Sequence, residues 1–364
     1  MIPFVYFLNI FFNFFYGMFI PIIPLMNEAQ AGVAFSCYGL SKIFTYYVFG
    51  KMIDSGKIKL SLILTLFFIF LVPVLYLLLP NIPLVAKFVE GIAFAGGTVF
   101  CFTFITLISI SKEKFEIELK KIMILSSIGS LLGPMAGYAF IGQDIKSASL
   151  LFLGLAVLIN ITGFLFIKQL DQLNKNKINI EFSDSRADKL NLNLVMLVLI
   201  FKGILMGIQP LIAYWCKDIF GFTLFVSGAA YLVSGLGFIA GTLRPRFLSI
   251  LVPIVSFGLL ELSFVYKSEL FWIANFAISF WLGSSLVKCI IDLGWVTTDK
   301  AGKLNSSWMA ISDIPLMITP ALFWEVKSTN DLKLRVSLIG LLVVIAFLLQ
   351  FKEKKRLTKK SQFV

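Results

Sequence analysis

SIGSLLGPMAGYAF, residues 127–140, places glycines at 129, 133 and 137 and a proline at 134. Glycines four residues apart let a neighbouring helix approach closely within a membrane. Proline removes one backbone hydrogen bond and bends the helix. The surrounding residues, 121–141, are long and apolar enough to cross a bilayer. The stretch therefore predicts a bent membrane helix that packs closely against a neighbour.

The same apolar character extends along the whole chain. Hydrophobic residues make up 59% of it and charged residues only 14%, whereas a soluble domain carries about a quarter charged residues. At roughly 30 residues for each span and its connection, 364 residues hold about twelve membrane helices. We expect spans near 2–25, 31–52, 60–79, 83–107, 121–141, 147–167, 190–215, 222–243, 247–265, 269–292, 304–325 and 333–351.

A polar segment divides these spans into two sets of six. It is rich in Asn, Lys and Asp and is typical of a solvated linker. The sequence thus predicts an all-α membrane protein with twelve transmembrane helices in two six-helix pseudo-repeats. The expected parts are an N-terminal half, 1–167, a cytoplasmic linker, 168–189, a C-terminal half, 190–351, and a basic cytoplasmic tail, 352–364.

The net charge of +12 has two interpretations, a nucleic-acid partner or a membrane topology. With the N-terminus in the cytoplasm, most of the 32 lysines and arginines fall on the inner side of the predicted spans. This asymmetry follows the positive-inside rule. It predicts a multi-pass protein of the cell inner membrane with both termini cytoplasmic, and it leaves no need for nucleic acid.

Histidine is absent, which excludes histidine metal sites and serine–histidine or cysteine–histidine nucleophiles. The four cysteines lie in apolar segments without a CxxC pair, so we interpret them as small buried side chains. We therefore expect no metal and no cofactor. Membrane enzymes usually cluster polar motifs at one membrane face, and none is visible, so we expect no enzyme.

The loop after the second predicted span reads GKMIDSGKIK, residues 50–59. It resembles the signature GxLxDRxGRR of the major facilitator superfamily, with one residue missing before Gly56 and Ser55 where a basic residue is usual. Glycines such as Gly50 and Gly56 suit a tight reversal of the chain. The resemblance implies that Asp54 pairs with basic groups and a helix N-terminus of the other half and latches one conformation. The alternative is an ordinary turn with a solvated carboxylate.

Two further motifs point to one branch of that superfamily. Residues 129–138 resemble the GxxxGPxxGG motif of its antiporter branches, with Tyr138 in place of the last glycine. The first span ends with Pro21 and Pro24, as in the drug:proton antiporter (efflux) subgroup, but it carries no acid. The resemblance implies a gating helix at the interface between the halves; a generic packing face is the alternative. The gating residues it names are Gly129, Gly133, Pro134 and Gly137.

The fourth span carries Lys87-Phe88-Val89-Glu90-Gly91, which resembles the superfamily motif RxxQG. Ionisable groups inside a membrane span are functional-site candidates. Glu90 is our candidate for a proton carrier, with Lys87 beside it. Equally, the two side chains simply neutralise each other one helical turn apart.

The resemblance also implies a polar cavity between the halves, lined by spans 1, 4, 7 and 10. The candidate substrate-binding residues are Asn9, Asn13, Tyr16, Lys202, Gln209, Tyr214, Asn275 and Trp281. Lys202 lies inside an apolar helix, where a charge costs several kcal/mol unless it is paired or hydrated. Its partner is an anionic or zwitterionic substrate, or an internal carboxylate such as Glu90 or Asp313. Asp313, with two nearby prolines, is expected to bend span 11 and take part in gating, while Lys42 and Glu261 are read as structural or interfacial.

Together these features predict a secondary active transporter that moves a small organic solute by alternating access. The antiporter motif favours proton-coupled export. The alternative is an importer of a nutrient, an anionic metabolite or a siderophore, and a more distant one is a non-transporting membrane protein or a membrane enzyme. The expected partners are the solute, protons and the lipid bilayer, and the expected state is a monomer.

Overall fold

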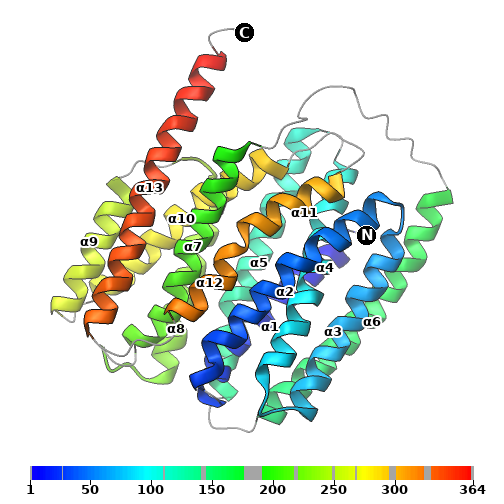
Figure 1. Ribbon diagram of the computed structural model, residues 1–364, viewed down its shortest axis with the longest axis horizontal. Coiled ribbons are helices and arrows are strands. Elements are labelled where there is room, and N and C mark those ends of the chain that lie inside the picture. The colour runs from blue at the N-terminus through cyan, green and yellow to red at the C-terminus, as the bar shows by residue number, and fades with distance from the viewer. Residues whose placement is uncertain are drawn as a thin grey trace.

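The structure is a computed structural model of the chain. It describes residues 2–26, 28–109, 111–140, 145–175, 191–216, 220–247, 251–266, 269–294, 301–323 and 329–361. The described part is built from α-helices that run roughly alongside one another (Figure 1).

The first six helices follow the predicted spans. They are α1 (Ile2–Met26), α2 (Glu28–Asp54), α3 (Ile58–Leu78), α4 (Pro83–Ile108), α5 (Lys112–Phe140) and α6 (Ile145–Lys175). Two boundaries differ from the prediction. Helix α5 begins at Lys112, in the segment read as a loop, and α6 continues to Lys175, into the segment read as a linker. The remainder of that linker lies outside the described residues.

The second set contains seven helices, because the eleventh predicted span is broken in two. They are α7 (Leu192–Tyr214), α8 (Leu224–Leu243), α9 (Leu251–Tyr266), α10 (Leu270–Gly294), α11 (Ala301–Ser312), α12 (Ile314–Phe323) and α13 (Thr329–Ser361). The break lies at Asp313, as the nearby prolines predicted. Helix α13 continues past the last predicted span into the basic tail, as far as Ser361.

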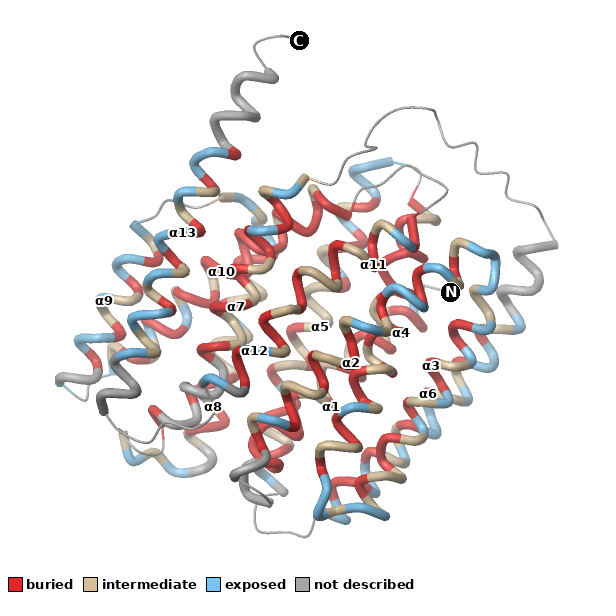
Figure 2. Tube along the Cα trace, viewed as in Figure 1, coloured by how far each residue is buried: buried red, intermediate tan, exposed pale blue. Residues whose placement is uncertain are grey.

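Eight of the described helices are long and apolar enough to cross a membrane on their own, and the segments Leu192–Ile208 and Leu251–Ser263 are shorter apolar helices. The all-α architecture of about twelve spans is therefore confirmed. Large apolar side chains stay exposed on the outer surface, for example Phe67, Leu165 and Leu348, while the residues between helices are buried (Figure 2). Such an extensive exposed apolar surface is typical of contact with lipid.

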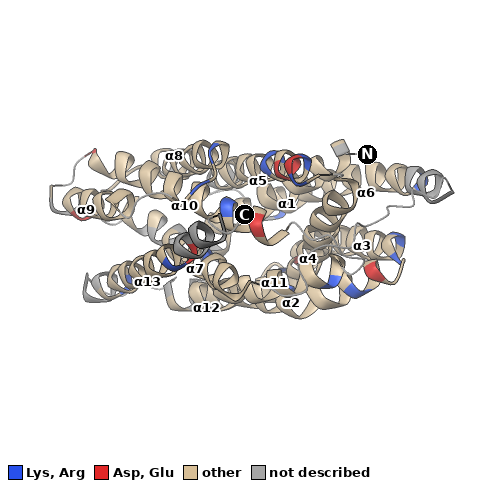
Figure 3. Cartoon of the chain, turned by 90° about the horizontal axis from the view of Figure 1, so that it is seen from above, with Lys and Arg blue, Asp and Glu red and all other residues tan. Residues whose placement is uncertain are grey.

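The helices pack as two groups. In the first group α1 packs on α5, α2 on α4, and α3 on α4 and α6; in the second, α10 packs on α7, α8 and α9, and α7 on α12 and α13. The groups meet along two lines, α5 against α8 and α2 against α11 and α12. Seen from above, these two contacts lie on opposite edges of the molecule (Figure 3). The space between them holds the site described next.

Candidate functional site

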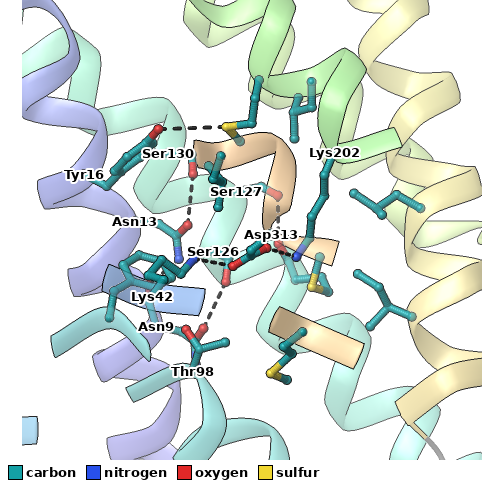
Figure 4. Close-up of a pocket in the computed structure, with 18 of the residues that line it drawn as sticks. Asn9, Asn13, Tyr16, Lys42, Thr98, Ser126, Ser127, Ser130, Lys202 and Asp313 are labelled. Atoms are coloured by element: carbon teal, nitrogen blue, oxygen red, sulfur yellow. Dashed lines mark hydrogen bonds and ion pairs between the residues drawn. The ribbon is translucent and has the colours of Figure 1, made fainter. Parts of the chain in front are cut away.

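A cavity of about 220 Å³ lies between the two helix groups. Its walls come from α1, α2, α4 and α5 on one side and from α7, α8, α10, α11 and α12 on the other. Aromatic and methionine side chains make up much of the wall, and a small number of polar groups converge within it (Figure 4). This mixture is typical of pockets that bind small molecules.

The break between α11 and α12 places Asp313 at the cavity. Its backbone N–H still donates to the carbonyl of Met309, at 2.9 Å, and its own carbonyl accepts from Leu316, at 2.9 Å. Pro315 has no N–H and its ring disfavours a continuous helix, which explains the local interruption. The Asp313 side chain is 1% exposed, so its carboxylate requires partners.

Two lysines supply those partners. Lys42 of α2 lies 2.7 Å from Oδ2 of Asp313, and Lys202 of α7 contacts Oδ1. Tyr46 of α2 also donates its hydroxyl to Oδ2, at 2.6 Å, and Lys202 donates to Ser312 Oγ at 2.9 Å. The two lysines reach the carboxylate from opposite sides (Figure 4). One carboxylate therefore meets two ammonium groups, one from each helix group.

The two lysines differ in their surroundings. The ammonium of Lys42 lies over the ring of Phe94, 4.3 Å from its centroid, and 5.3 Å from that of Tyr38, with 5% of the side chain exposed. Aromatic faces stabilise a cation that is withdrawn from water. Lys202 keeps 20% of its side chain exposed. Lys202 is thus the more accessible of the two cations.

Polar side chains of α1 and α5 form a second part of the wall. Ser126 donates to Asn9 Oδ1 at 3.2 Å, and Ser130 donates to Asn13 Oδ1 at 3.3 Å. Both asparagine amides donate to backbone carbonyls of their own helix. Tyr16, further along α1, places its hydroxyl 3.9 Å from the sulfur of Met206 in the other helix group. All three predicted residues of span 1 therefore line the cavity, as does Lys202.

Lys87 and Glu90 form a separate buried cluster. The Lys87 ammonium lies 2.9 Å from Oε1 and 2.8 Å from Oε2 of Glu90, and the Tyr76 hydroxyl donates to Oε2 at 3.3 Å. Neither residue is among those that line the cavity. The aromatic rings within 5.6 Å of the ammonium are those of Tyr16, Phe19, Phe35 and Tyr38. Lys87 and Glu90 therefore pair with each other inside the first helix group and do not form part of the cavity wall.

The other predicted substrate residues lie elsewhere. Asn275 is buried between α10 and α8, where it donates to the carbonyl of Ala230 at 2.8 Å. Trp281 packs edge-on against Phe201 with 5.3 Å between centroids, and neither Asn275 nor Trp281 lines the cavity. The side chains of Gln209 and Tyr214 lie outside the described part of the structure.

Sequence reasoning read Lys42 as structural or interfacial and did not include it among the residues of the cavity. Helix α2 packs directly on α11 and α12, so that Lys42, Tyr46 and Tyr38 face the cavity. A usable signal was present, because Lys42, like Lys202, is a charge within an apolar helix. The serines of α5 were also missed, although Ser126 and Ser127 directly precede the glycine motif and Ser130 lies within it. Glu261, the other residue that we read as structural, is exposed on α9.

At one end of the α2–α11 contact, Asp54 caps a helix of the other group. Its carboxylate oxygens accept from the backbone N–H groups of Gly302, at 2.8 Å, and Lys303, at 2.7 Å, at the start of α11. A carboxylate satisfies free N–H groups there and interacts favourably with the helix dipole. A Cβ on Gly50 would lie 2.6 Å from the Gly302 carbonyl, so α2 and α11 touch closely. Gly56 has a φ of 76°, which glycine adopts readily, and it turns the chain into α3.

The glycine motif of α5 faces α1. A Cβ on Gly129, Gly133 or Gly137 would overlap the backbone carbonyls of Ile10, Phe14 and Met18, respectively. Pro134 packs beside Gly17 on the same helix. Helix α5 does lie at the interface with the other group, through Leu131 against Gly235 of α8, but on another face. Helix α5 was expected at the interface between the halves and contacts α8 there, whereas its glycine face packs within the first helix group, as in the alternative of a generic packing face.

At the sequence level, no protein-family model matches the chain, and a search of curated proteins found no match. Solved structures do match it over nearly its full length. The human organic anion transporter MFSD10 (TETRAN) has a TM-score of 0.73 at 12% identity, with 96% of this chain and 98% of that chain covered. A bacterial homologue of the iron transporter ferroportin, in its outward-facing state, has a TM-score of 0.70 at 14% identity, with coverages of 97% and 99%. The major facilitator superfamily transporter FucP, in its outward conformation, has a TM-score of 0.64 at 14% identity, with coverages of 96% and 98%. This chain therefore has the fold of the major facilitator superfamily transporters.

Proposed function

We propose that the protein is a secondary active transporter of the major facilitator superfamily that moves a small organic anion by alternating access. The observation that carries the proposal is the charge of the central cavity, where Lys42 and Lys202 face Asp313, the one carboxylate among the described residues that line it. A transporter of this architecture binds its solute between the two helix groups. A catalytic role is not part of the proposal.

The excess positive charge supports an anionic solute. A charge within a membrane protein is costly unless a partner or water compensates it. Asp313 offers one negative charge to two ammonium groups, so an anion entering the cavity completes the compensation. One of the proteins with the same fold, MFSD10, is described as an organic anion transporter, so this fold accommodates anionic solutes in at least that protein.

The rest of the wall supports a solute with an apolar or aromatic body. Phe94, Phe102 and Trp308 line the cavity beside Tyr16 and Tyr38. Aromatic rings provide stacking surfaces and edges for another ring. The volume of about 220 Å³ suits a small molecule rather than a peptide or a large siderophore.

The contact of Asp54 with the start of α11 supports a state in which one side of the transporter is closed. Under the positive-inside topology this is the cytoplasmic side. We therefore propose that the structure corresponds to an outward-facing conformation, in an inner membrane with both termini cytoplasmic. Opening toward the cytoplasm would then require Asp54 to release the N–H groups of Gly302 and Lys303.

For direction, we propose export coupled to proton entry, on the strength of the antiporter motif in α5. Import of an anionic nutrient or metabolite is the second candidate, and the acid-free α1 and the lysine-rich cavity favour it. Glu90 stays the candidate proton carrier, but its burial beside Lys87 means that it does not compete with the solute by direct contact in the cavity.

Transport by the purified protein in proteoliposomes tests the function. A panel of labelled organic anions, neutral analogues and cations is offered to vesicles with and without a pH gradient, with protein-free vesicles as the control. We expect accumulation of one or more anions and a dependence on the gradient whose sign gives the direction. Accumulation of cations alone, or a flux far above carrier turnover, would contradict the proposal.

A further inference from the structure

The cavity carries a defined formal charge. Among the described residues that line it, the lysine, arginine, aspartate and glutamate side chains are those of Lys42, Lys202 and Asp313. Their formal charges leave one positive charge in excess. The nearby Lys87 and Glu90 form a neutral pair behind Tyr16 and Tyr38, so they do not change this balance.

We propose that Asp313 is an internal counter-anion that sets the charge of the solute, so that the cavity selects monoanions over dianions. This rests on the proposed function and specifies its substrate class. A monoanion brings the cavity to neutrality. A dianion leaves one negative charge uncompensated beside a carboxylate that is withdrawn from water, and a like-charge arrangement of this kind excludes wrong partners.

The geometry indicates that Asp313 stays in place while the solute binds. Its Oδ2 accepts from Tyr46, at 2.6 Å, and lies 2.7 Å from the ammonium of Lys42. It also sits in the break between α11 and α12, where its own backbone groups are hydrogen-bonded. A solute anion would have to replace all of these contacts to displace it.

The same geometry gives the two lysines different roles. Lys42 is enclosed by aromatic rings and committed to Asp313. Lys202 has a fifth of its side chain exposed and donates to Ser312 beside the cavity. We therefore assign contact with the solute anion to Lys202, and the fixed ion pair to Lys42 and Asp313.

Substitutions that change the charge in steps test this assignment. Asp313→Asn raises the excess to two positive charges, Lys42→Gln lowers it to zero, and the double variant Lys42→Gln/Asp313→Asn restores one. The ligands are benzenesulfonate, benzenedisulfonate and benzenesulfonamide, whose ring is shared and whose charge differs. Dissociation constants are measured on the purified protein in detergent, and each protein is judged by the ratio between its ligands, so that a smaller folded fraction cancels.

We expect the wild type to bind benzenesulfonate at least roughly tenfold more tightly than the disulfonate. Asp313→Asn should reverse the order, Lys42→Gln should remove the preference for either anion over the sulfonamide, and the double variant should return to the wild-type order. An Asp313→Asn protein that keeps the monoanion preference, or a double variant that behaves like Asp313→Asn, would overturn the inference.

Lys202→Gln keeps the inference testable if Asp313→Asn does not fold. It leaves Lys42 and Asp313 as a neutral pair, so the preference for benzenesulfonate over the sulfonamide should fall to about one; an unchanged preference would overturn the assignment. A wild-type protein that binds none of the anions would instead overturn the proposed function itself. The two failures are therefore distinguishable.

Discussion

Lys42 and Asp313 form a 2.7 Å ion pair that joins the two helix groups. The pair lies within a continuous contact between α2 and the broken span α11–α12. A Cβ on Gly39 would overlap the backbone of Leu316 on one side of it, and Gly50 approaches Gly302 on the other. The charge that defines the cavity is thus part of the contact surface between the two groups. Under the proposed alternating access, this relationship would connect solute binding to closure at Asp54.

Loss of the Asp54 cap should favour separation of α2 from α11. Asp54→Asn leaves one acceptor oxygen for two backbone N–H groups and removes the negative charge beside the helix N-terminus. Such a charge is worth about 0.3–1 kcal/mol, which corresponds to a roughly two- to fivefold shift in the population of the closed state. Spin labels at Lys57 and Lys303, in a protein whose native cysteines are replaced, measure that population by their distance distribution.

The matched control for this change is Ser55→Ala, because the Ser55 hydroxyl donates only within its own turn, to Met52. We expect a larger share of long distances in Asp54→Asn and no change in the control. Identical distributions in the two variants would show that the cap does not hold the closed side.

The glycine face of α5 should determine stability more than gating. Gly133→Ala would push α1 and α5 apart, because the added Cβ overlaps the Phe14 carbonyl, and overpacking of this kind costs about 1–3 kcal/mol. Gly154→Ala in α6 is the control, since a Cβ there meets nothing within 4 Å. Thermal unfolding in detergent should show a lower midpoint for Gly133→Ala only. A normal midpoint with abolished transport would instead support the gating role.

The Lys87–Glu90 pair should behave as a buried ion pair. Lys87→Met leaves the Glu90 carboxylate buried without its cation, and breaking such a pair costs about 3–5 kcal/mol. The double variant Lys87→Met/Glu90→Gln removes both charges and should recover most of the stability. The partly exposed pair of Lys120 with Glu116 is the comparison, where Lys120→Met should cost at most about 1 kcal/mol. Equal unfolding midpoints for Lys87→Met and Lys120→Met would contradict a buried pair.

Glu90→Gln tests proton coupling separately from solute binding. If Glu90 carries the proton, the amide should abolish transport driven by a pH gradient but leave exchange of labelled for unlabelled solute intact. Glu261→Gln, in an exposed acid of α9, should change neither rate. Full gradient-driven transport by Glu90→Gln would show that Glu90 is not the proton carrier.

The fold was predictable because the length and apolarity of each span carry it. The helix boundaries were harder to predict, because a helix can continue beyond the apolar residues that define its span. At the start of α5, for example, Lys120 lies 2.7 Å from Glu116 one turn away, and such pairs support a solvated helix. The break at Asp313 was predictable because the prolines that disrupt span 11 are visible in the sequence.

The site was predictable only in part, because a sequence does not fix the face that each helix turns to its neighbours. Asn275 and Trp281 are polar or aromatic residues of the expected helix, yet they face α8 and α7. The place of Lys42 in the cavity wall was not predicted, because the close approach of α2 to α12 at Gly39 is visible only in the structure. For Lys202, the sequence left a solute and an internal carboxylate open as partners, and the structure supplies Asp313.

Counterflow of benzenesulfonate in proteoliposomes is the most direct measurement of anion selection by the lysine-rich cavity. Vesicles are loaded with unlabelled solute, and the entry of labelled solute is followed for the wild type and for Lys202→Gln, with Gly154→Ala as a folded control. We expect exchange by the wild type and the control, no exchange of a benzyl ammonium cation, and a loss of at least roughly tenfold in Lys202→Gln. Undiminished exchange in Lys202→Gln, or exchange of the cation in place of the sulfonate, would contradict anion transport through this cavity.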